Sequence, residues 1–171
     1  MQLRTDGIVI HQQTIGESDI LVTLLTRDRG VLSVWAKNAR RARSKFGTAT
    51  DLLCYSQLEL FYHKERYSLN SAEVREIFFG LRGNIEKIAL GGYFAQLAYY
   101  MIPPEEPAEE PLRLLLNALH YLEKDKRPPS LIKAVFELRL LAISGFMPDL
   151  VGCAQCGDYD SARFYFSPVQ G

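Results

Sequence analysis

The sequence predicts an α+β protein built from two units, a small five-stranded β-barrel followed by an α-helical unit. Up to about residue 78 the apolar residues fall in short runs that partly alternate with polar ones, as in β-strands. From about residue 84 they recur every three or four positions, which is the period of a helix. The change of period predicts domains at residues 1–80 and 81–171.

The first unit contains five candidate strands, at residues 7–11, 20–26, 31–36, 52–62 and 67–77. The segment between the second and third strands ends at Gly30, which can adopt a positive φ, so we expect a tight turn there. Five short strands with short turns predict a closed or nearly closed antiparallel barrel. The OB-fold is the commonest barrel of this size that binds oligonucleotides, and an SH3-like barrel is the competing prediction.

The second unit contains three candidate helices, at about residues 84–102, 111–123 and 131–144. In the first helix we expect one apolar face, formed by Ile85, Ile88, Ala89, Tyr93, Leu97 and Tyr100. The third helix is apolar around much of its circumference, so we expect it at the centre of a bundle. Between the first two helices, residues 103–111 carry four acidic residues and several prolines, and they are interpreted as a solvated linker that cannot pack as a helix or strand.

Bulk composition places the chain among ordinary globular proteins. Of its 171 residues 47% are hydrophobic and 23% are charged, which supports a core and argues against disorder. Three cysteines are too few for a secreted disulfide framework, and the first residues lack the pattern of a signal peptide. No apolar run reaches the length that a membrane helix needs. We therefore expect a cytoplasmic protein with no membrane partner.

Positive charge is concentrated in one segment although the whole chain is neutral, with 20 basic and 20 acidic residues. Residues 26–46 hold seven basic residues against Asp28 alone. These are Arg27, Arg29, Lys37, Arg40, Arg41, Arg43 and Lys45. Five of them lie in residues 37–45, which we call the basic loop. Long cations in a loop can follow the phosphates of a nucleic acid and gain affinity by counterion release, without reading base sequence. The alternative is a solvated surface loop.

Aromatic residues accompany this loop, and in single-strand binders such side chains stack on bases beside a basic groove. The candidates are Trp35, Phe46, Tyr55, Phe61, Tyr62 and Tyr67. Each could equally belong to the barrel core. Phe46 is the best stacking candidate, because it lies in the loop between Lys45 and Gly47.

A CxxC motif, Cys153-Ala-Gln-Cys156, is followed by glycine and has the form of a zinc knuckle. It is half of a site, because a zinc ribbon places its second pair after about 15–20 further residues, just beyond Gly171. We therefore expect a partial zinc-ribbon knuckle at residues 150–171, with zinc held by Cys153 and Cys156. A redox role would need a surrounding βαβ pattern, which the sequence lacks. Cys54 reads as a core residue.

Catalytic motifs are missing from the sequence: it has no glycine-rich phosphate loop, no HExxH and no GxSxG. We therefore expect a protein that is not an enzyme. The nucleic-acid-binding hypothesis competes with a protein-interaction module, in which the helical half offers an apolar groove to a partner peptide and the barrel is only structural. An RNA-binding barrel is a third, weaker possibility.

The order of motifs along the chain resembles that of the bacterial RecO family. The resemblance rests on Gly7-Ile-Val-Ile10, Gly16-Glu-Ser-Asp19, Gly30-Val-Leu32, Ala36 through Lys45, Leu69 through Glu73, and the terminal CxxC. It implies an N-terminal OB-fold, a helical domain and often a four-cysteine zinc module. It also implies sequence-independent binding of single- and double-stranded DNA, strand annealing at the nucleoid, and loading of RecA onto DNA coated by single-stranded-DNA-binding protein. RecR and, in some bacteria, RecF are the implied partners.

Overall fold

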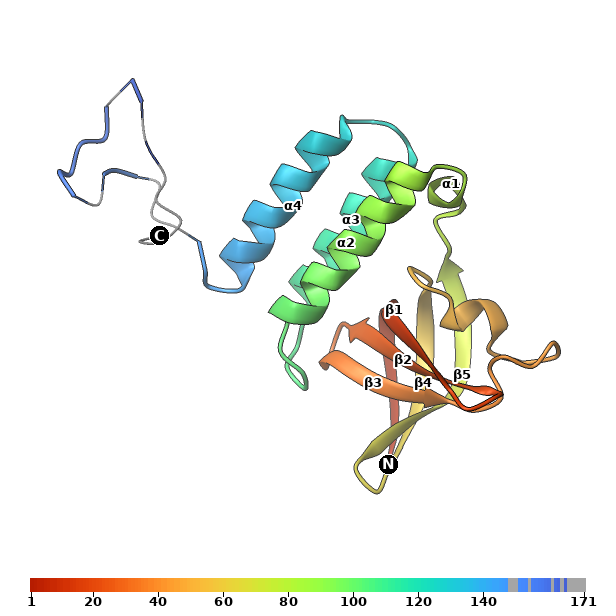
Figure 1. Cartoon of the computed structure of the whole chain (residues 1–171). Helices are drawn as coiled ribbons and strands as arrows, with labels where there is room; N and C mark the ends of the chain where they lie inside the picture. Colours follow the sequence, from red (N-terminus) through yellow and green to blue (C-terminus); the bar gives the residue numbers. More distant parts are fainter. Residues whose placement is uncertain (148–150, 154, 161, 164, 166–171) are drawn as a thin grey trace.

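The computed structural model describes residues 1–147, 151–153, 155–160, 162, 163 and 165 (Figure 1). Its strands are β1 (Gln2–Ile15), β2 (Asp19–Thr26), β3 (Gly30–Ala36), β4 (Tyr55–His63) and β5 (Arg66–Glu76). They close into a barrel in the order β1-β2-β3-β5-β4. Neighbouring strands are antiparallel except β3 and β5, which meet in parallel over two residue pairs. The predicted five-stranded OB-fold barrel is confirmed, with a short 3-10 helix (Gly47–Thr50) between β3 and β4.

β1 is much longer than the predicted strand at residues 7–11. Its first half pairs with β4 and its second half with β2, and a bulge lies between Val9 and His11. Around the bulge both faces of the strand are buried: Val9 belongs to the barrel interior, whereas Ile8 and Ile10 belong to the core of the helical unit. A strand that is buried on both faces shows no alternation, which is why its pattern in sequence was short and ambiguous.

In the part of the chain that the structure describes, four helices follow the barrel: α1 (Phe79–Arg82), α2 (Ile85–Met101), α3 (Glu109–Glu123) and α4 (Pro129–Ile143). They lie against one side of the barrel and share a hydrophobic core with it, in which Ile8 and Leu25 of the barrel meet residues of α2, α3 and α4. The two units are thus joined by packing as well as by the chain. Among the described residues, no helix combines the length and the apolar character needed to span a bilayer.

The face predicted for α2 was right only in part: Ile88, Tyr93 and Leu97 are partly buried against the core, but the other three members of that face are exposed. Its buried residues are Gly91, Phe94, Ala95 and Ala98, whereas Ile85 and Tyr100 of the predicted face are 83% and 72% exposed. The helix is apolar almost all round, so its periodicity selects no face. The small residues determine which face of α2 is buried, because they let the helix come close to its neighbours. A Cβ added at Gly91 would stand 2.9 Å from Cδ1 of Leu53.

α4 lies at the outer edge of the bundle beside α3, so its predicted central position was also wrong (Figure 1). Only Ile132, Phe136 and Leu140 are buried, while Val135 and Leu138 are 47% and 46% exposed. The helix buries one narrow stripe, and the rest of its apolar circumference faces outward.

Residues 103–111, predicted as a linker that cannot pack as a helix or strand, contain no named element before Glu109, but their backbone docks on the turn between β2 and β3. The N–H groups of Glu105 and Ala108 donate to the carbonyls of Arg29 and Arg27, at 2.9 and 2.8 Å, and Pro104 forms a β-bridge with Gly30. The last part of the segment is already helical, since α3 begins at Glu109. The acidic side chains are largely exposed, as expected, but the docked backbone ties the helical unit to the barrel.

Candidate nucleic-acid interface

The basic loop leaves the end of β3, on the side of the barrel away from α4, and is held by a set of backbone hydrogen bonds (Figure 1). The N–H of Arg40 donates to the carbonyl of Ser18 at 3.0 Å, which ties the loop to the β1–β2 turn. Within the loop, the N–H groups of Arg41 and Ser44 donate to the carbonyls of Asn38 and Arg41. Ala39 is buried beneath these turns. The loop therefore has a defined shape.

Asp19, the first residue of β2, anchors the start of the loop. Its carboxylate accepts the N–H of Asn38 at 2.8 Å and the indole N–H of Trp35 at 2.9 Å. These two donors, in that order, lower the pKa of Asp19, and nearby Lys37 and Arg41 lower it further against a partial desolvation. Trp35, a stacking candidate in sequence, thus serves to position the loop through its ring nitrogen.

The five cations of the basic loop are exposed, and Asp19 offsets the charge of Lys37 and Arg41 only from beyond ion-pair distance. Among the described residues, none of Lys37, Arg40, Arg41, Arg43 and Lys45 lies within ion-pair distance of a carboxylate. Arg40 donates to the carbonyl of Glu17 at 3.4 Å, and Lys45 to the carbonyl of Asn70 at 2.7 Å. Such neutral acceptors orient a side chain without cancelling its charge. This is the electrostatic footprint expected of a surface that binds phosphates.

Arg27 and Arg29 lie apart from the basic loop, at the other end of β3, a separation of about 20 Å at about 3.3 Å per residue. Arg27 pairs with Asp6 at 3.2 Å and with Asp28 at 3.3 Å, and Asp28 is the main cause of its raised pKa. Arg29 pairs with Glu105 at 3.6 Å. The structure does not join these two arginines to the loop, and their role in binding stays a prediction.

Phe46 is not available for base stacking, so this prediction was wrong. The side chain is only 4% exposed and belongs to the core of the barrel together with Ala36 and Ala39. Lys45 covers it from outside, with Nζ 4.8 Å from the ring centroid. The loop folds back over the open end of the barrel, and Phe46 fills that end. Local sequence could not show this, because the contact is made with distant residues.

The other predicted aromatics divide between core and surface. Tyr55 packs against the core of the helical unit, and the rings of Tyr62 and Tyr67 lie 4.7 Å apart. Phe61 is 48% exposed and is the only exposed member of the six. The sequence did not single out Tyr99, which lines a cleft of about 470 Å³ between β3 and the end of α2, together with Tyr67 and Tyr100. Glu65 and Glu105 also line this cleft, and their negative charge disfavours a DNA backbone there.

A groove of about 500 Å³ runs between α3 and α4. Its floor is apolar and includes Leu114, Ala118, Ile132, Val135 and Phe136. Three arginines stand around it, Arg113, Arg127 and Arg139, against the single acid Glu110. The competing interpretation of the sequence, a protein-interaction module, placed an apolar groove in the helical half, but its residues could not be chosen because they depend on how α3 and α4 pack.

The CxxC motif forms a tight turn in which the N–H of Gly157 donates to the carbonyl of Cys153 at 2.8 Å, with Gly157 at a φ of 73°. N–H groups of Cys156 and Gln155 lower the pKa of the Cys153 thiol, which favours the thiolate form that binds zinc. Both cysteines are free. The turn therefore fits one half of a zinc knuckle. Residues 150, 154, 161, 164 and 166–171 of the predicted knuckle lie outside the described residues. Cys54 is fully buried, as expected.

Comparison with known proteins gives the same division of the chain as the structure. Residues 1–78 match the family described as Recombination protein O N terminal, and residues 82–171 match Recombination protein O C terminal. The DNA repair protein RecO of Acetivibrio thermocellus is 38% identical over 165 residues, which cover 96% of this chain and 66% of that protein. That of Symbiobacterium thermophilum is 36% identical over 170 residues, which cover 97% of this chain and 67% of that protein.

The chain thus spans about two thirds of the length of these relatives. Both halves match in the expected order, the barrel coincides with the N-terminal family and the helices with the C-terminal one. The relatives are named for DNA repair and not for an enzymatic activity. The chain belongs to the RecO family of DNA repair proteins.

Proposed function

We propose that the basic loop binds the backbones of single- and double-stranded DNA without sequence specificity, and that this binding serves strand annealing and the loading of RecA. One observation carries the proposal: five exposed cations of a fixed loop have no carboxylate partner among the described residues. Phosphates are the natural partners of such a surface, since binding them releases condensed counterions.

Annealing brings two negatively charged strands together, so their mutual repulsion opposes it. A loop that neutralises phosphates of both strands lowers this repulsion. Contacts to the backbone alone suit the task, because any complementary pair must be served. In this proposal RecR and, in some bacteria, RecF act with the protein at the nucleoid. Cys153 and Cys156 would supply two thiolates to a zinc ion, whose chemistry there is structural cross-linking.

Removing three of the loop charges is expected to reduce the salt dependence of DNA binding. For Arg40→Ala/Arg41→Ala/Arg43→Ala, the slope of log K against log salt on single-stranded DNA should fall by about 2, at about 0.7 per lost phosphate contact. Affinity should fall for all base sequences alike. The measurement is fluorescence anisotropy with two labelled oligonucleotides of unrelated sequence, over a range of salt concentrations.

The matched control is Arg4→Ala/Arg75→Ala/Lys126→Ala, which removes the same charge from exposed positions outside the loop. Its slope should stay near that of the parent chain. If the two triple variants lose the same slope, net charge and not the loop governs binding, and the proposal fails. Competition between matched DNA and RNA strands tests the RNA-binding alternative.

The groove between α3 and α4 favours a second binding function, that of an adaptor for a partner peptide. Its apolar floor would hold apolar side chains, and its three arginines would hold acidic ones. Among the described residues, neither Arg127 nor Arg139 pairs with a carboxylate. We propose the tail of single-stranded-DNA-binding protein as the occupant, which would bring the protein to coated DNA.

A charge placed in this groove is expected to weaken peptide binding. Val135→Asp adds a carboxylate to the apolar floor, and the affinity for a fluorescein-labelled tail peptide should fall at least about tenfold, which corresponds to about 1.4 kcal/mol. Leu138→Asp is the matched control, because Leu138 has nearly the same exposure on the same helix but does not line the groove. Equal peptide affinities of the two variants would rule out this groove, and DNA binding should change in neither.

A further inference from the structure

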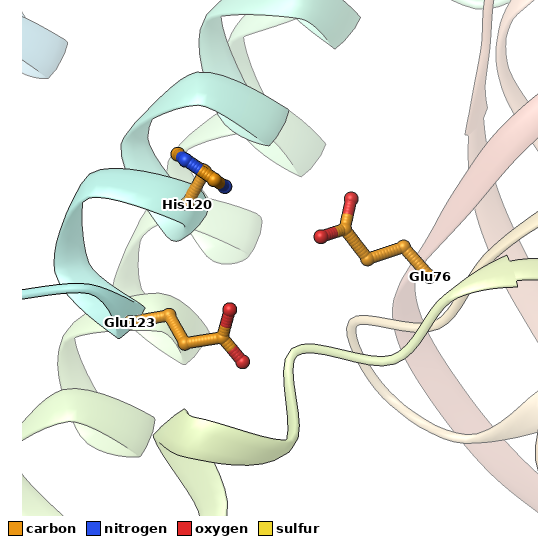
Figure 2. A group of neighbouring side chains, drawn as sticks. All are labelled: Glu76, His120 and Glu123. Carbon is orange, nitrogen blue, oxygen red and sulfur yellow. The ribbon is translucent and has the colours of Figure 1, made fainter.

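Three side chains that can ligate a metal meet where the barrel joins the helical unit (Figure 2). They are Glu76, His120 and Glu123, and one ligand atom of each lies within 4.8 Å of those of the other two. Glu76 is the last residue of β5. His120 and Glu123 are three residues apart near the end of α3, so they lie on the same face of that helix. The cluster therefore draws its donors from both units.

Glu123 is held in position by the segment that connects the two units. Its Oε1 accepts the N–H of Gly80 at 2.9 Å. A Cβ added at Gly80 would stand 2.6 Å from Cγ of Glu123, so the two residues are in close contact. The N–H of Gly80 is the main cause of the lowered pKa of Glu123, which keeps this carboxylate ionised at neutral pH. One donor of the cluster is thus already oriented.

Glu76 and His120 are available for a ligand. Within the described part of the chain, no hydrogen bond or ion pair of either side chain is found. His120 has a ring contact with Tyr121 and lies close enough to Glu123 to contribute to the lowering of the pKa of Glu123. Glu76 is exposed and can change rotamer, whereas His120 is partly buried. Glu76 and His120 therefore face Glu123, whose position is fixed. Both could bind an ion without losing a described hydrogen bond or ion pair.

The local electrostatics favour a cation. Two carboxylates lie together beside the C-terminal end of α3, where the helix dipole adds partial negative charge. Lys124 approaches Oε2 of Glu123 at 3.3 Å, but its side chain is 52% exposed and can move away. Lys87 is occupied by the carboxylate of Asp125, at 2.6 Å. A positive ion between Glu76 and Glu123 would relieve the repulsion of the two carboxylates.

The donor set indicates the class of ion. One imidazole nitrogen and two carboxylate oxygens suit Zn²⁺ and related transition metals, whereas Mg²⁺ and Ca²⁺ prefer oxygen ligands alone. Donors about 2.0–2.2 Å from a tetrahedral ion lie about 3.4 Å apart, so the ligand atoms, which lie within 4.8 Å of one another, need to approach by at most about 1.4 Å. Rotation of the exposed Glu76 side chain can supply this movement.

We propose that Glu76, His120 and Glu123 bind one divalent transition-metal ion, of which Zn²⁺ fits best, with water completing its coordination. The ion links the end of β5 to α3 and so clamps the barrel to the helical unit. This site is separate from the cysteine knuckle and from the basic loop.

The test removes the competing thiolates first. In the full chain carrying Cys153→Ser and Cys156→Ser, titration with ZnCl₂ by calorimetry should give one equivalent of bound ion, and Zn²⁺ should raise the Tm. Adding His120→Ala should weaken Zn²⁺ binding at least about tenfold. Mutation of a residue that only hydrogen-bonds to a metal ligand typically costs about 10–100-fold in affinity, and loss of the ligand itself should cost no less. The Tm without metal should stay unchanged, which shows that the variant folds.

His63→Ala in the same cysteine-free background is the matched control, since His63 is exposed at the end of β4, outside the cluster. It should bind Zn²⁺ like its parent. Co²⁺ should give a visible d–d spectrum without thiolate charge-transfer bands, and His120→Ala should abolish it. Absence of binding, or equal affinity of the His120 and His63 variants, overturns the site.

Discussion

Phe94→Ala is expected to lower the free energy of unfolding by about 3–5 kcal/mol, the cost of deleting a fully buried aromatic ring and leaving a cavity. Phe94 on α2 is 0% exposed, and its ring stacks on Phe136 of α4 with centroids 4.3 Å apart. Both rings belong to the core that also contains Ile8 and Leu25 of the barrel. The substitution therefore weakens the packing between α2 and α4 and the attachment of the helices to the barrel.

Urea denaturation, followed by circular dichroism, measures this loss. Tyr100→Ala is the control, because it removes a similar ring from the same helix at a position that is 72% exposed. We expect Tyr100→Ala to change the free energy of unfolding by about 0.5 kcal/mol or less, as for most surface substitutions. A similar cost for the two variants would contradict the burial of Phe94. DNA binding should persist at urea concentrations where the Phe94 variant stays folded.

Gly30→Val should destabilise the protein by about 3 kcal/mol or more, because two separate penalties add. Gly30 has a φ of 56°, a conformation that costs a β-branched residue about 1–2 kcal/mol. In addition, a Cβ there would stand 2.4 Å from the carbonyl oxygen of Pro103 and 2.7 Å from that of Glu106. Both neighbours are backbone atoms that cannot rotate away, so the segment at residues 103–108 must leave the β2–β3 turn.

Gly16→Val separates the two penalties. Gly16 has nearly the same φ, 60°, but an added Cβ meets nothing within 4 Å. It should therefore cost only the backbone term, about 1–2 kcal/mol. Hydrogen exchange should show faster exchange at the amides of Glu105 and Ala108 in the Gly30 variant alone. If both variants have the same Tm and the same exchange, the docked segment contributes nothing to stability.

The strands of the barrel could be predicted because a strand leaves a local signal. Apolar runs and turn residues located all five strands. They underestimated the length of β1, where Ile8 and Ile10 face one core and Val9 faces another. The pairing of β3 with β5, which closes the barrel, has no local signal because it joins residues distant in sequence.

The helical unit shows where periodicity fails. On α2 and α4 apolar residues occupy most of the circumference, so the choice of buried face depends on which neighbour can approach. Gly91 decides it for α2, because Leu53 of the barrel occupies the space a side chain would need. The docking of residues 103–108 could not be predicted from the sequence either, since it uses backbone groups that any sequence carries.

The candidate DNA-binding site was visible in part. Its charge is a property of composition, so residues 37–45 stood out at once. Its shape was not, because Asp19 and Ser18, which hold the loop, lie on the preceding hairpin. Phe46 was misjudged for the same reason: whether a loop aromatic is exposed depends on where the loop folds.

The shared core of Phe94, Leu25 and their neighbours has a consequence for how a coated strand would be bound. The basic loop leaves the barrel on the side away from α4, which lines the groove together with α3, and both the barrel and the packed helices lie between the two surfaces (Figure 1). Under the proposed function, a strand carrying tailed proteins meets both surfaces at once. Capture of a tail in the groove then sets the effective concentration of DNA at the basic loop. A short, rigid connection between groove and loop raises this concentration more than a flexible linker would. Two weak contacts would in this way give avidity that neither has alone.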